Sequence, residues 1–297
     1  MGTPQEFDEH SITPHVIETF RDCPDPRLKR IMTVVVTKLH EAVRELELTT
    51  AEWEFAIDFL TRVGQISDSR RQEMILLSDT LGVSMLVDAI NNRAPAGSTQ
   101  STVLGPFYVA GPPTAALGEN IDRGEKGGEP MYVDARILDL DGRPIGGATV
   151  DVWHSDEDGF YDVQYGPEAE ATRRARFAAD AEGRVWFWSS LPSKYPIPDD
   201  GPVGQMLAAV GRHPWRPAHL HFRITAPGYK PLITHIFVRE SEYLDGDAVF
   251  GVKASLIDEF PRQPPGLAPD GTRMERPYRR LSWDFRLPRL DQLPRAA

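Results

Sequence analysis

The sequence is poor in cysteine, in long apolar segments and in positive charge. Its single cysteine, Cys23, excludes an intrachain disulfide framework and any thiolate-rich zinc or iron–sulfur site. No apolar run approaches the length of a membrane span, and the N-terminus has no basic-then-apolar signal pattern. A formal net charge of −11 argues against nucleic acid or an anionic membrane as the main partner. These absences predict a cytoplasmic protein.

The first hundred residues have the three-and-four apolar spacing of amphipathic helices. Asp25-Pro26 is typical of an N-cap followed by proline at the first helical position, and the apolar series 28–46 covers about five helical turns. Thr49–Glu52 has the pattern of a capping box that opens a second helix. The side of this second helix that we expect to be buried comprises Trp53, Ala56, Ile57 and Leu60.

Two shorter helices are expected next. Asp68 or Ser69 is the expected cap of a helix that runs through Leu77, and Gly82 separates it from a helix over 84–91. No strand is expected in this part of the chain.

Beyond residue 130 the apolar pattern alternates, as it does in strands that have one face buried. Strands are expected around 133–137, 149–154, 184–188, 217–225, 232–239 and 281–287. Short strands separated by turns such as Asp141-Gly142 are typical of a β-sandwich or barrel. The 297 residues therefore predict an α+β protein, with an all-helical domain over 1–102 and a β-sandwich domain over 103–297.

Two histidines share one face of an expected strand. In Arg216-Pro-Ala-His-Leu-His-Phe-Arg223, His219 and His221 would point to one side, and the apolar residues that alternate with them to the other. Two imidazoles side by side on a rigid strand form half of a metal site. A core histidine next to a surface histidine is the simpler alternative.

Two sets of residues could complete a metal site here. His154 and Asp156 have the His-x-Asp spacing of the Fe(II) two-histidine, one-carboxylate triad, but that triad leaves one histidine of the strand unused. Tyr161, after a strand end, and Tyr195, in a proline-rich loop, offer a set that uses both histidines. Phenolate is a hard anionic donor that suits Fe(III). Each tyrosine taken singly could equally be a packing residue.

Four segments together resemble the intradiol ring-cleavage dioxygenases. They are Gly105-Pro-Phe-Tyr108, Val152-Trp-His-Ser-Asp-Glu-Asp-Gly-Phe-Tyr161, Tyr195-Pro-Ile-Pro198 and Arg216-Pro-Ala-His219-Leu-His221. The resemblance covers nearly the whole chain. It implies one Fe(III) per chain, held by a hydroxide and by Tyr161, Tyr195, His219 and His221. It also implies that Tyr195 is displaced by the substrate and acts as a base, while Arg216 stabilises negative charge on the ring.

The sequence around Asp79 and Phe107 is more similar to the hydroxyquinol 1,2-dioxygenase branch than to the catechol branch. This resemblance implies that hydroxyquinol (1,2,4-trihydroxybenzene) is cleaved with O2 to 3-hydroxy-cis,cis-muconate or maleylacetate, in aromatic degradation. Asp79 would meet the third ring hydroxyl, although it could simply cap the helix turn before Gly82. The implied substrate pocket comprises Leu76, Asp79, Val103, Phe107, Ile197, Pro198 and Val249. Catechol or chlorocatechol is the alternative substrate.

The helical part also has an implied role in assembly. In the catechol and hydroxyquinol members it forms a homodimer interface with an apolar tunnel that holds a phospholipid, so we expect a homodimer here and a phospholipid at its interface. A non-catalytic transthyretin-like β-sandwich is the alternative of another class, but it leaves the four spaced ligands unexplained. Of the other histidines, His154 is expected to be structural, and His235 to fill or hydrogen-bond within the sandwich.

Overall fold

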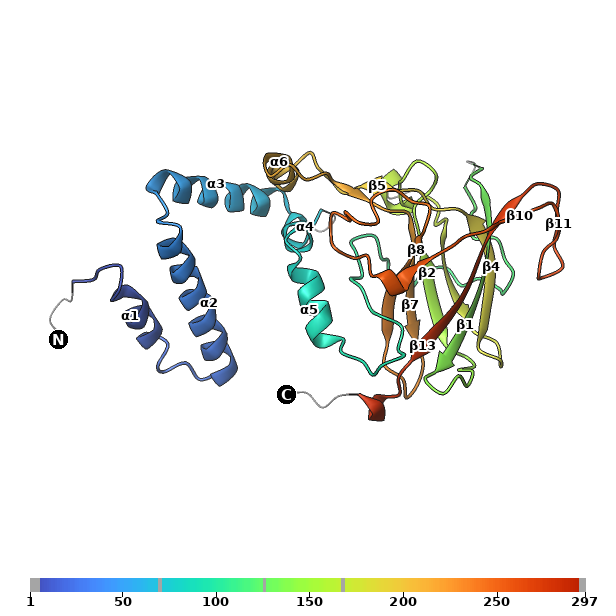
Figure 1. The fold of residues 1–297 in the computed structure, drawn as a ribbon, viewed down its shortest axis with the longest axis horizontal. Coiled ribbons are helices and arrows are strands. Elements are labelled where there is room, and N and C mark those ends of the chain that lie inside the picture. Colours follow the sequence, from blue (N-terminus) through green and yellow to red (C-terminus); the bar gives the residue numbers. More distant parts are fainter. Residues whose placement is uncertain (1–5, 69–70, 125–126, 167–168, 294–297) are drawn as a thin grey trace. The chain divides into compact units, whose positions relative to one another are not determined.

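The computed structural model describes residues 6–68, 71–124, 127–166 and 169–293 (Figure 1). The chain divides into two compact units, Met1–Gln65 and Ile66–Ala297, each of which is described by itself. A helical part precedes a sheet-rich part, so the predicted α+β class is confirmed. The last two helices before the sheets belong to the second unit.

The two longer helices of the first part begin where the sequence predicts. The carboxylate of Asp25 accepts hydrogen bonds from two backbone N–H groups of the first turn of α2, which begins at Pro26. Thr49 and Glu52 form the expected capping box, with Thr49 N donating to Glu52 Oε2 at 2.9 Å. The helices are α1 (Ile12–Glu18), α2 (Pro26–Glu45) and α3 (Thr50–Ile66).

The apolar side of α3 that was expected to be buried is exposed in the single chain. Trp53 is 53% exposed, and Ile57 and Leu60 are also exposed. The structure describes all twenty residues of α2, and none of them is buried. Apolar periodicity identifies the face that avoids water but not what covers it.

The described residues of the second unit form three α-helices: α4 (Glu73–Thr80), α5 (Val83–Asn91) and α6 (Pro202–Ala209). Gly82, at a left-handed φ of 73°, separates α4 from α5 as expected. The cap prediction for α4 was wrong for Asp68, whose carboxylate accepts instead from Arg71 N, two residues before the helix. Ser69, the other expected cap, lies outside the described residues. The sequence did not predict α6.

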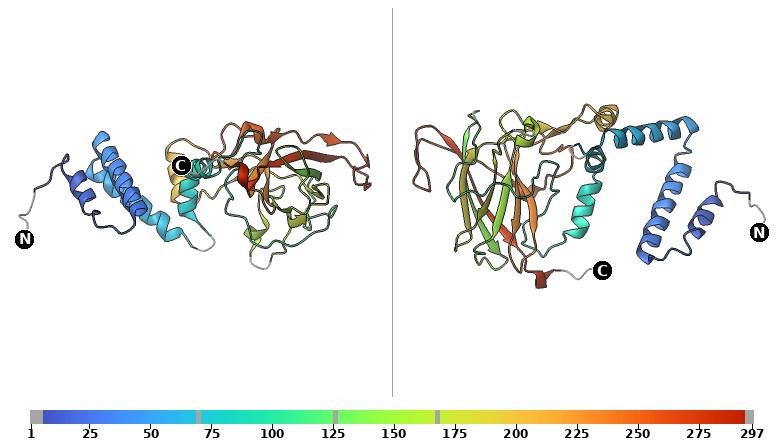
Figure 2. Two further views of the ribbon diagram at one scale, coloured as in Figure 1. Left: turned by 90° about the horizontal axis from the view of Figure 1, so that it is seen from below. Right: turned by 180° about the vertical axis from the view of Figure 1, so that it is seen from behind.

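The expected sandwich consists of two main sheets (Figures 1 and 2). One has the strand order β10-β13-β1-β4 and the other β3-β2-β7-β8-β9. Their bounds are β1 (Pro130–Asp139), β2 (Thr149–Trp153), β3 (Arg174–Ala178), β4 (Arg184–Ser190), β7 (His219–Thr225), β8 (Leu232–Val238), β9 (Ile257–Asp258), β10 (Arg262–Gln263) and β13 (Tyr278–Leu287). Two short ladders join β5 (Tyr195–Pro196) to β6 (Trp215–Arg216) and β11 (Gly266–Leu267) to β12 (Arg273–Met274). The sequence did not predict β3 or the two-residue strands.

The two faces of β7 have different surroundings, and only one of them belongs to the apolar core. Leu220, Phe222 and Ile224 are fully buried in the main apolar cluster between the sheets, which fixes the register of the strand. The histidines that alternate with them face the other way. Within the described residues, no helix is both long and apolar enough to cross a membrane.

Candidate metal centre

The two histidines of β7 converge on one point. His219 and His221 are each 1% exposed, and their Nε2 atoms lie 3.1 Å apart. His219 Nδ1 lies 2.7 Å from the Pro217 carbonyl oxygen. A histidine that donates from Nδ1 to a carbonyl keeps a free lone pair on Nε2, which is the usual arrangement of a metal ligand.

Two tyrosines reach the same point from other segments. Tyr161 follows β2 at the start of the 3₁₀-helix Asp162–Tyr165, and its hydroxyl lies 2.9 Å from His221 Nε2. Tyr195 lies on β5, and its ring meets that of Tyr161 edge to face, with centroids 5.3 Å apart. Both rings are buried. The structure therefore brings together all four residues of the expected ligand set.

Glycine at position 159 allows the two tyrosine segments to meet. Gly159 has a φ of +88°, and a Cβ there would lie 2.9 Å from both the Lys194 carbonyl oxygen and Tyr195 Cβ. A side chain would therefore strain the backbone and push the loop that carries Tyr195 away.

The protonation states of these residues fit a metal. Burial, with repulsion from Arg216 second, lowers the pKa of His219 to about 3, and burial holds the pKa of His221 well below its ordinary value. Both imidazoles are therefore neutral, which is the form that binds a metal ion. Burial and the neighbouring Tyr195 raise the pKa of Tyr161 well above 10. Ionisation of Tyr161 therefore needs a strongly charged ion next to it, and two phenolates with two imidazoles suit Fe(III).

The rival set of His154 and Asp156 is not arranged for a metal. His154 Nδ1 lies 2.7 Å from the Ser155 carbonyl oxygen and its Nε2 lies 2.7 Å from Ser189 Oγ, so both nitrogens are engaged. Asp156 Oδ1 accepts from two backbone N–H groups of its own turn. The prediction that His154 is structural is consistent with these bonds.

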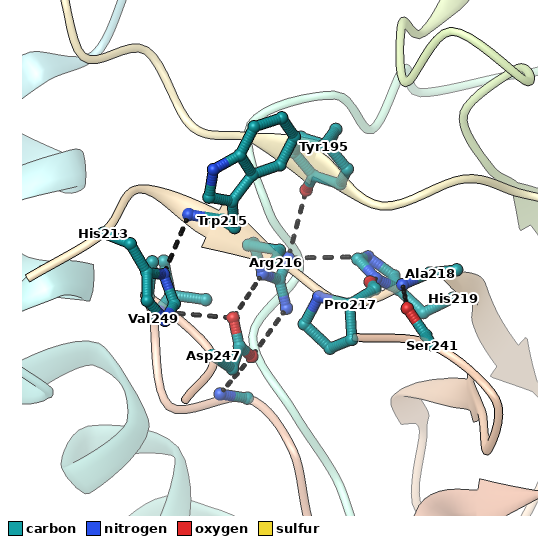
Figure 3. Close-up of polar contacts among 12 residues, drawn as sticks. Tyr195, His213, Trp215, Arg216, Pro217, Ala218, His219, Ser241, Asp247 and Val249 are labelled. Atoms are coloured by element: carbon teal, nitrogen blue, oxygen red, sulfur yellow. Dashed lines mark hydrogen bonds and ion pairs between the residues drawn. The ribbon is translucent and has the colours of Figure 1, made fainter. Parts of the chain in front are cut away.

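A buried ion pair lies beside Tyr195 (Figure 3). Arg216 Nε lies 3.0 Å from Asp247 Oδ1, and its Nη1 lies 3.2 Å from the Tyr195 hydroxyl and 3.5 Å from His219 Nε2. Burial would lower the pKa of Arg216, but the interactions with Asp247, Tyr195 and Tyr161 together outweigh it and the pKa is raised. Burial would likewise raise the pKa of Asp247, but Arg216 holds it below its usual value. Both groups are therefore charged at neutral pH.

A cavity of about 650 Å³, counted to its open mouth, adjoins Tyr195 and Arg216. This size is typical of a small-ligand pocket. Asp79 is one of the polar residues that line the cavity. Burial raises the pKa of Asp79, and Asp247 adds a smaller increase, whereas Ser84 and Arg216 lower it. Its walls include the seven residues expected there: Leu76, Asp79, Val103, Phe107, Ile197, Pro198 and Val249.

Comparison with known proteins agrees with this geometry. The family described as "Dioxygenase" matches residues 103–288, and the one described as "Catechol dioxygenase N terminus" matches residues 25–99. The chain belongs to the intradiol ring-cleavage dioxygenase family. It is an enzyme of that family, so the alternative of a non-catalytic transthyretin-like module was wrong.

Similar intradiol dioxygenases come from several bacteria. A hydroxyquinol 1,2-dioxygenase of Rhizobium sp. (strain MTP-10005) is 56% identical over 86% of this chain and 87% of its own. A 6-chlorohydroxyquinol 1,2-dioxygenase of Cupriavidus pinatubonensis is 52% identical over 88% of this chain and 95% of its own. The crystal structure of a hydroxyquinol 1,2-dioxygenase from Pseudomonas putida DLL-E4 is 45% identical, with a TM-score of 0.89 over 95% of this chain and 98% of that one.

Three neighbours of this dioxygenase site were not identified from the sequence. Asp247 lies in a loop without periodicity, and no sequence signal connects it to Arg216. The ring of Trp153 stacks on that of His221, with centroids 4.6 Å apart. The sequence predicted only that a strand ends at His154 and did not indicate this contact. His235 was expected inside the sandwich, yet it pairs with His221 across the β7–β8 ladder. Counting residues outward from the Pro227-Gly228 turn could have placed it there.

Proposed function

We propose that this intradiol dioxygenase cleaves hydroxyquinol with O2 to 3-hydroxy-cis,cis-muconate or maleylacetate, as a step in aromatic degradation. The observation that carries the proposal is the convergence of two tyrosine hydroxyls and two histidine Nε2 atoms beside a pocket that is lined by the buried carboxylate of Asp79. A second buried carboxylate of that pocket, Glu73, is already paired with Arg71. The names of the similar bacterial enzymes support the same substrate class.

Tyr161, Tyr195, His219 and His221 would hold one Fe(III) per chain. When bound, the ferric ion would supply Lewis acidity that binds both ortho oxygens of the ring and makes the ring reactive toward O2. The chain keeps the four donors in place: the Pro217 carbonyl orients His219, and the contacts of Gly159 with the Tyr195 loop bring the two tyrosines together.

Tyr195 and Arg216 would serve as catalytic residues next to the ring. As a phenolate, Tyr195 would take the proton from a substrate hydroxyl and become a neutral phenol, which is general base catalysis. Arg216 lies 3.2 Å from that tyrosine oxygen and remains charged because Asp247 is paired with it. A fixed guanidinium in a site that excludes water stabilises negative charge that develops on the ring or on the tyrosine.

The pocket walls would select the ring. Apolar side chains would pack on the faces and edges of a single aromatic ring and exclude water, while Asp79 accepts a hydrogen bond from the third hydroxyl. Catechol, which lacks that hydroxyl, would leave the buried Asp79 without this hydrogen bond, and this disfavours catechol. Catechol and chlorocatechols are the competing substrates.

A visible spectrum tests both parts of the proposal. The purified protein should show a tyrosinate-to-Fe(III) charge-transfer band that shifts when hydroxyquinol is added without O2 and decays when O2 is admitted. The kcat/KM for hydroxyquinol should exceed those for catechol, chlorocatechols and protocatechuate. Absence of the band from iron-loaded protein would contradict the ligand set, and a preference for another diol would contradict the substrate.

We further infer a cytoplasmic homodimer that is formed through the N-terminal helices and has a phospholipid at its interface. The support is the row of exposed apolar side chains on α2, among them Leu39 at 60% and Val43 at 47%. Sedimentation at micromolar concentration should give a dimer, and Leu39→Glu should weaken it, whereas Lys38→Glu on the same helix should not. Mass spectrometry of a lipid extract of the purified dimer tests for the phospholipid, and a wild-type monomer would contradict the assembly.

A further inference from the structure

Three histidines, not two, occupy the sheet face beneath the pocket. β7 and β8 are antiparallel, and His221 lies directly opposite His235 in their register. His219 is two residues before His221 and so lies on the same face. The ring centroid of His235 is 4.2 Å from that of His221 and 4.7 Å from that of His219, and one nitrogen from each of the three rings lies within 4.8 Å of the other two.

His235 is not one of the four expected iron ligands, and its ring nitrogens lack hydrogen bonds of normal geometry within the described residues. Its side chain is fully buried, and its polar neighbour, the Val103 backbone, does not reach either ring nitrogen with normal hydrogen-bond geometry. A buried polar group without a partner costs about 1–3 kcal/mol, so its presence calls for an explanation. A packing residue at this position could be apolar at no such cost.

We propose that His219, His221 and His235 form a second metal-binding mode of this centre, one that holds a divalent ion such as Zn²⁺, Co²⁺ or Fe²⁺ through three imidazoles and no phenolate. Imidazole nitrogen suits divalent zinc, copper and iron, and three histidines hold the zinc of carbonic anhydrase. A divalent ion has less charge than Fe(III) with which to ionise two buried phenols, so the neutral nitrogens are its better ligands.

The geometry requires only a small adjustment. Two nitrogens that share a tetrahedral ion at about 2.1 Å lie about 3.4 Å apart. The Nε2 atoms of His219 and His221, at 3.1 Å, lie close to this separation. His235 would turn its ring toward them, and it has no normal hydrogen bond to break within the described residues.

The two modes exclude each other because they share His219 and His221. A divalent ion held by the three imidazoles would leave Tyr161 and Tyr195 as neutral phenols, so the protein would lack the tyrosinate colour and could not take up Fe(III) until the ion left. The inference rests on the proposed ferric site only for these shared ligands.

The test is a titration of the iron-free full-length chain with Co²⁺, followed by competition with Zn²⁺. The wild type should bind one Co²⁺ with the visible bands of a four- or five-coordinate ion. His235→Gln should weaken binding at least tenfold, or about 1.4 kcal/mol. Tyr161→Phe should change it less than threefold, as should the control His154→Gln, which alters a buried histidine outside the cluster. Equal affinity in His235→Gln and wild type, or a larger loss in Tyr161→Phe, would overturn the proposal.

A second measurement does not depend on how the variant folds. The electron paramagnetic resonance spectrum of the wild-type chain with one bound Cu²⁺ should show coupling to three imidazole nitrogens, and two would overturn the proposal. Loading His235→Gln with Fe(III) separates the two hypotheses. If it keeps the tyrosinate band but loses Co²⁺ affinity, both modes hold. If the wild type lacks the band yet binds Co²⁺ through three imidazoles, only the ferric proposal fails.

Discussion

Arg216 and Asp247 form an ion pair from which water is excluded: Nε of one lies 3.0 Å from Oδ1 of the other, and the two side chains are 3% and 1% exposed. Asp247 Oδ2 also accepts from Gly251 N at 2.8 Å, so the carboxylate is fixed from two directions. The pair holds a permanent positive charge against the hydroxyl of Tyr195.

Asp247→Asn should therefore be severely destabilising. It leaves the Arg216 charge buried without a counter-charge, and breaking a buried pair costs about 3–5 kcal/mol of unfolding free energy. Chemical denaturation of the iron-free protein measures this cost. Asp284→Asn is the matched control, because Asp284 pairs with Arg136 at a site where the side chains are 32% and 55% exposed, and it should cost only ~0–1 kcal/mol. Equal losses in the two variants would contradict the assignment.

The same pair predicts a pH dependence of stability. Since Arg216 holds the pKa of Asp247 below its unfolded value of about 3.9, the stabilisation is complete above that pH and is lost as the pH falls through the lowered folded pKa. The difference in unfolding free energy between wild type and Asp247→Asn should therefore be constant near neutral pH and shrink in acid. A difference that grew in acid would be inconsistent with this sign.

Asp79 should behave in the opposite way. Because burial raises its folded pKa, its ionised form destabilises the protein at neutral pH, and the penalty is relieved as the pH falls through that pKa toward the unfolded value. Asp79→Asn should therefore be more stable than wild type at pH 7, with the gain vanishing in acid. Thermal melts across pH check this, and an asparagine variant that is less stable at pH 7 would refute it.

An apolar substitution at the same position should alter substrate choice. If Asp79 accepts a hydrogen bond from the third ring hydroxyl, Asp79→Leu should lower kcat/KM for hydroxyquinol roughly 10- to 100-fold, since a hydrogen bond to a charged group contributes ~1.5–3 kcal/mol. The kcat/KM for catechol should change little. Steady-state kinetics on the two substrates measure the ratio, and equal losses on both would indicate a structural role for Asp79.

Gly159→Ala should disturb the centre more than its backbone strain alone explains. A non-glycine residue in the left-handed region costs about 1–2 kcal/mol, and Gly142→Ala, at φ +81° with nothing within 4 Å, isolates that cost. Gly159→Ala adds contacts of 2.9 Å with the Tyr195 loop, so it should cost a further ~1–3 kcal/mol and shift the tyrosinate band. Denaturation and visible spectra of the two variants provide the comparison.

Much of this site could be predicted from the sequence because its parts are local patterns. His219 and His221 share a strand face by alternation, and burial of Leu220 and Phe222 fixes which face that is. What could not be predicted depends on contacts between distant segments. β3 was not predicted because arginines occupy alternate positions of this segment, so its sequence lacks the apolar alternation of a half-buried strand. In the structure, Arg174 and Arg176 are paired with aspartates from other segments.

Pairing of distant strands also dictates how the protein can fold. β1 pairs in parallel with β13, with Met131 opposite Arg279, so all four proposed iron ligands lie in the stretch of chain between these two strands. Forming this ladder requires closure of a long loop, and the conformational entropy of that loop is lost before the strand contacts form. Folding is therefore expected to be slow, and one edge of β1 stays unpaired until β13 docks. Reduced refolding yield at high protein concentration is the expected result, and iron capture is expected to follow closure of the sheet rather than guide it.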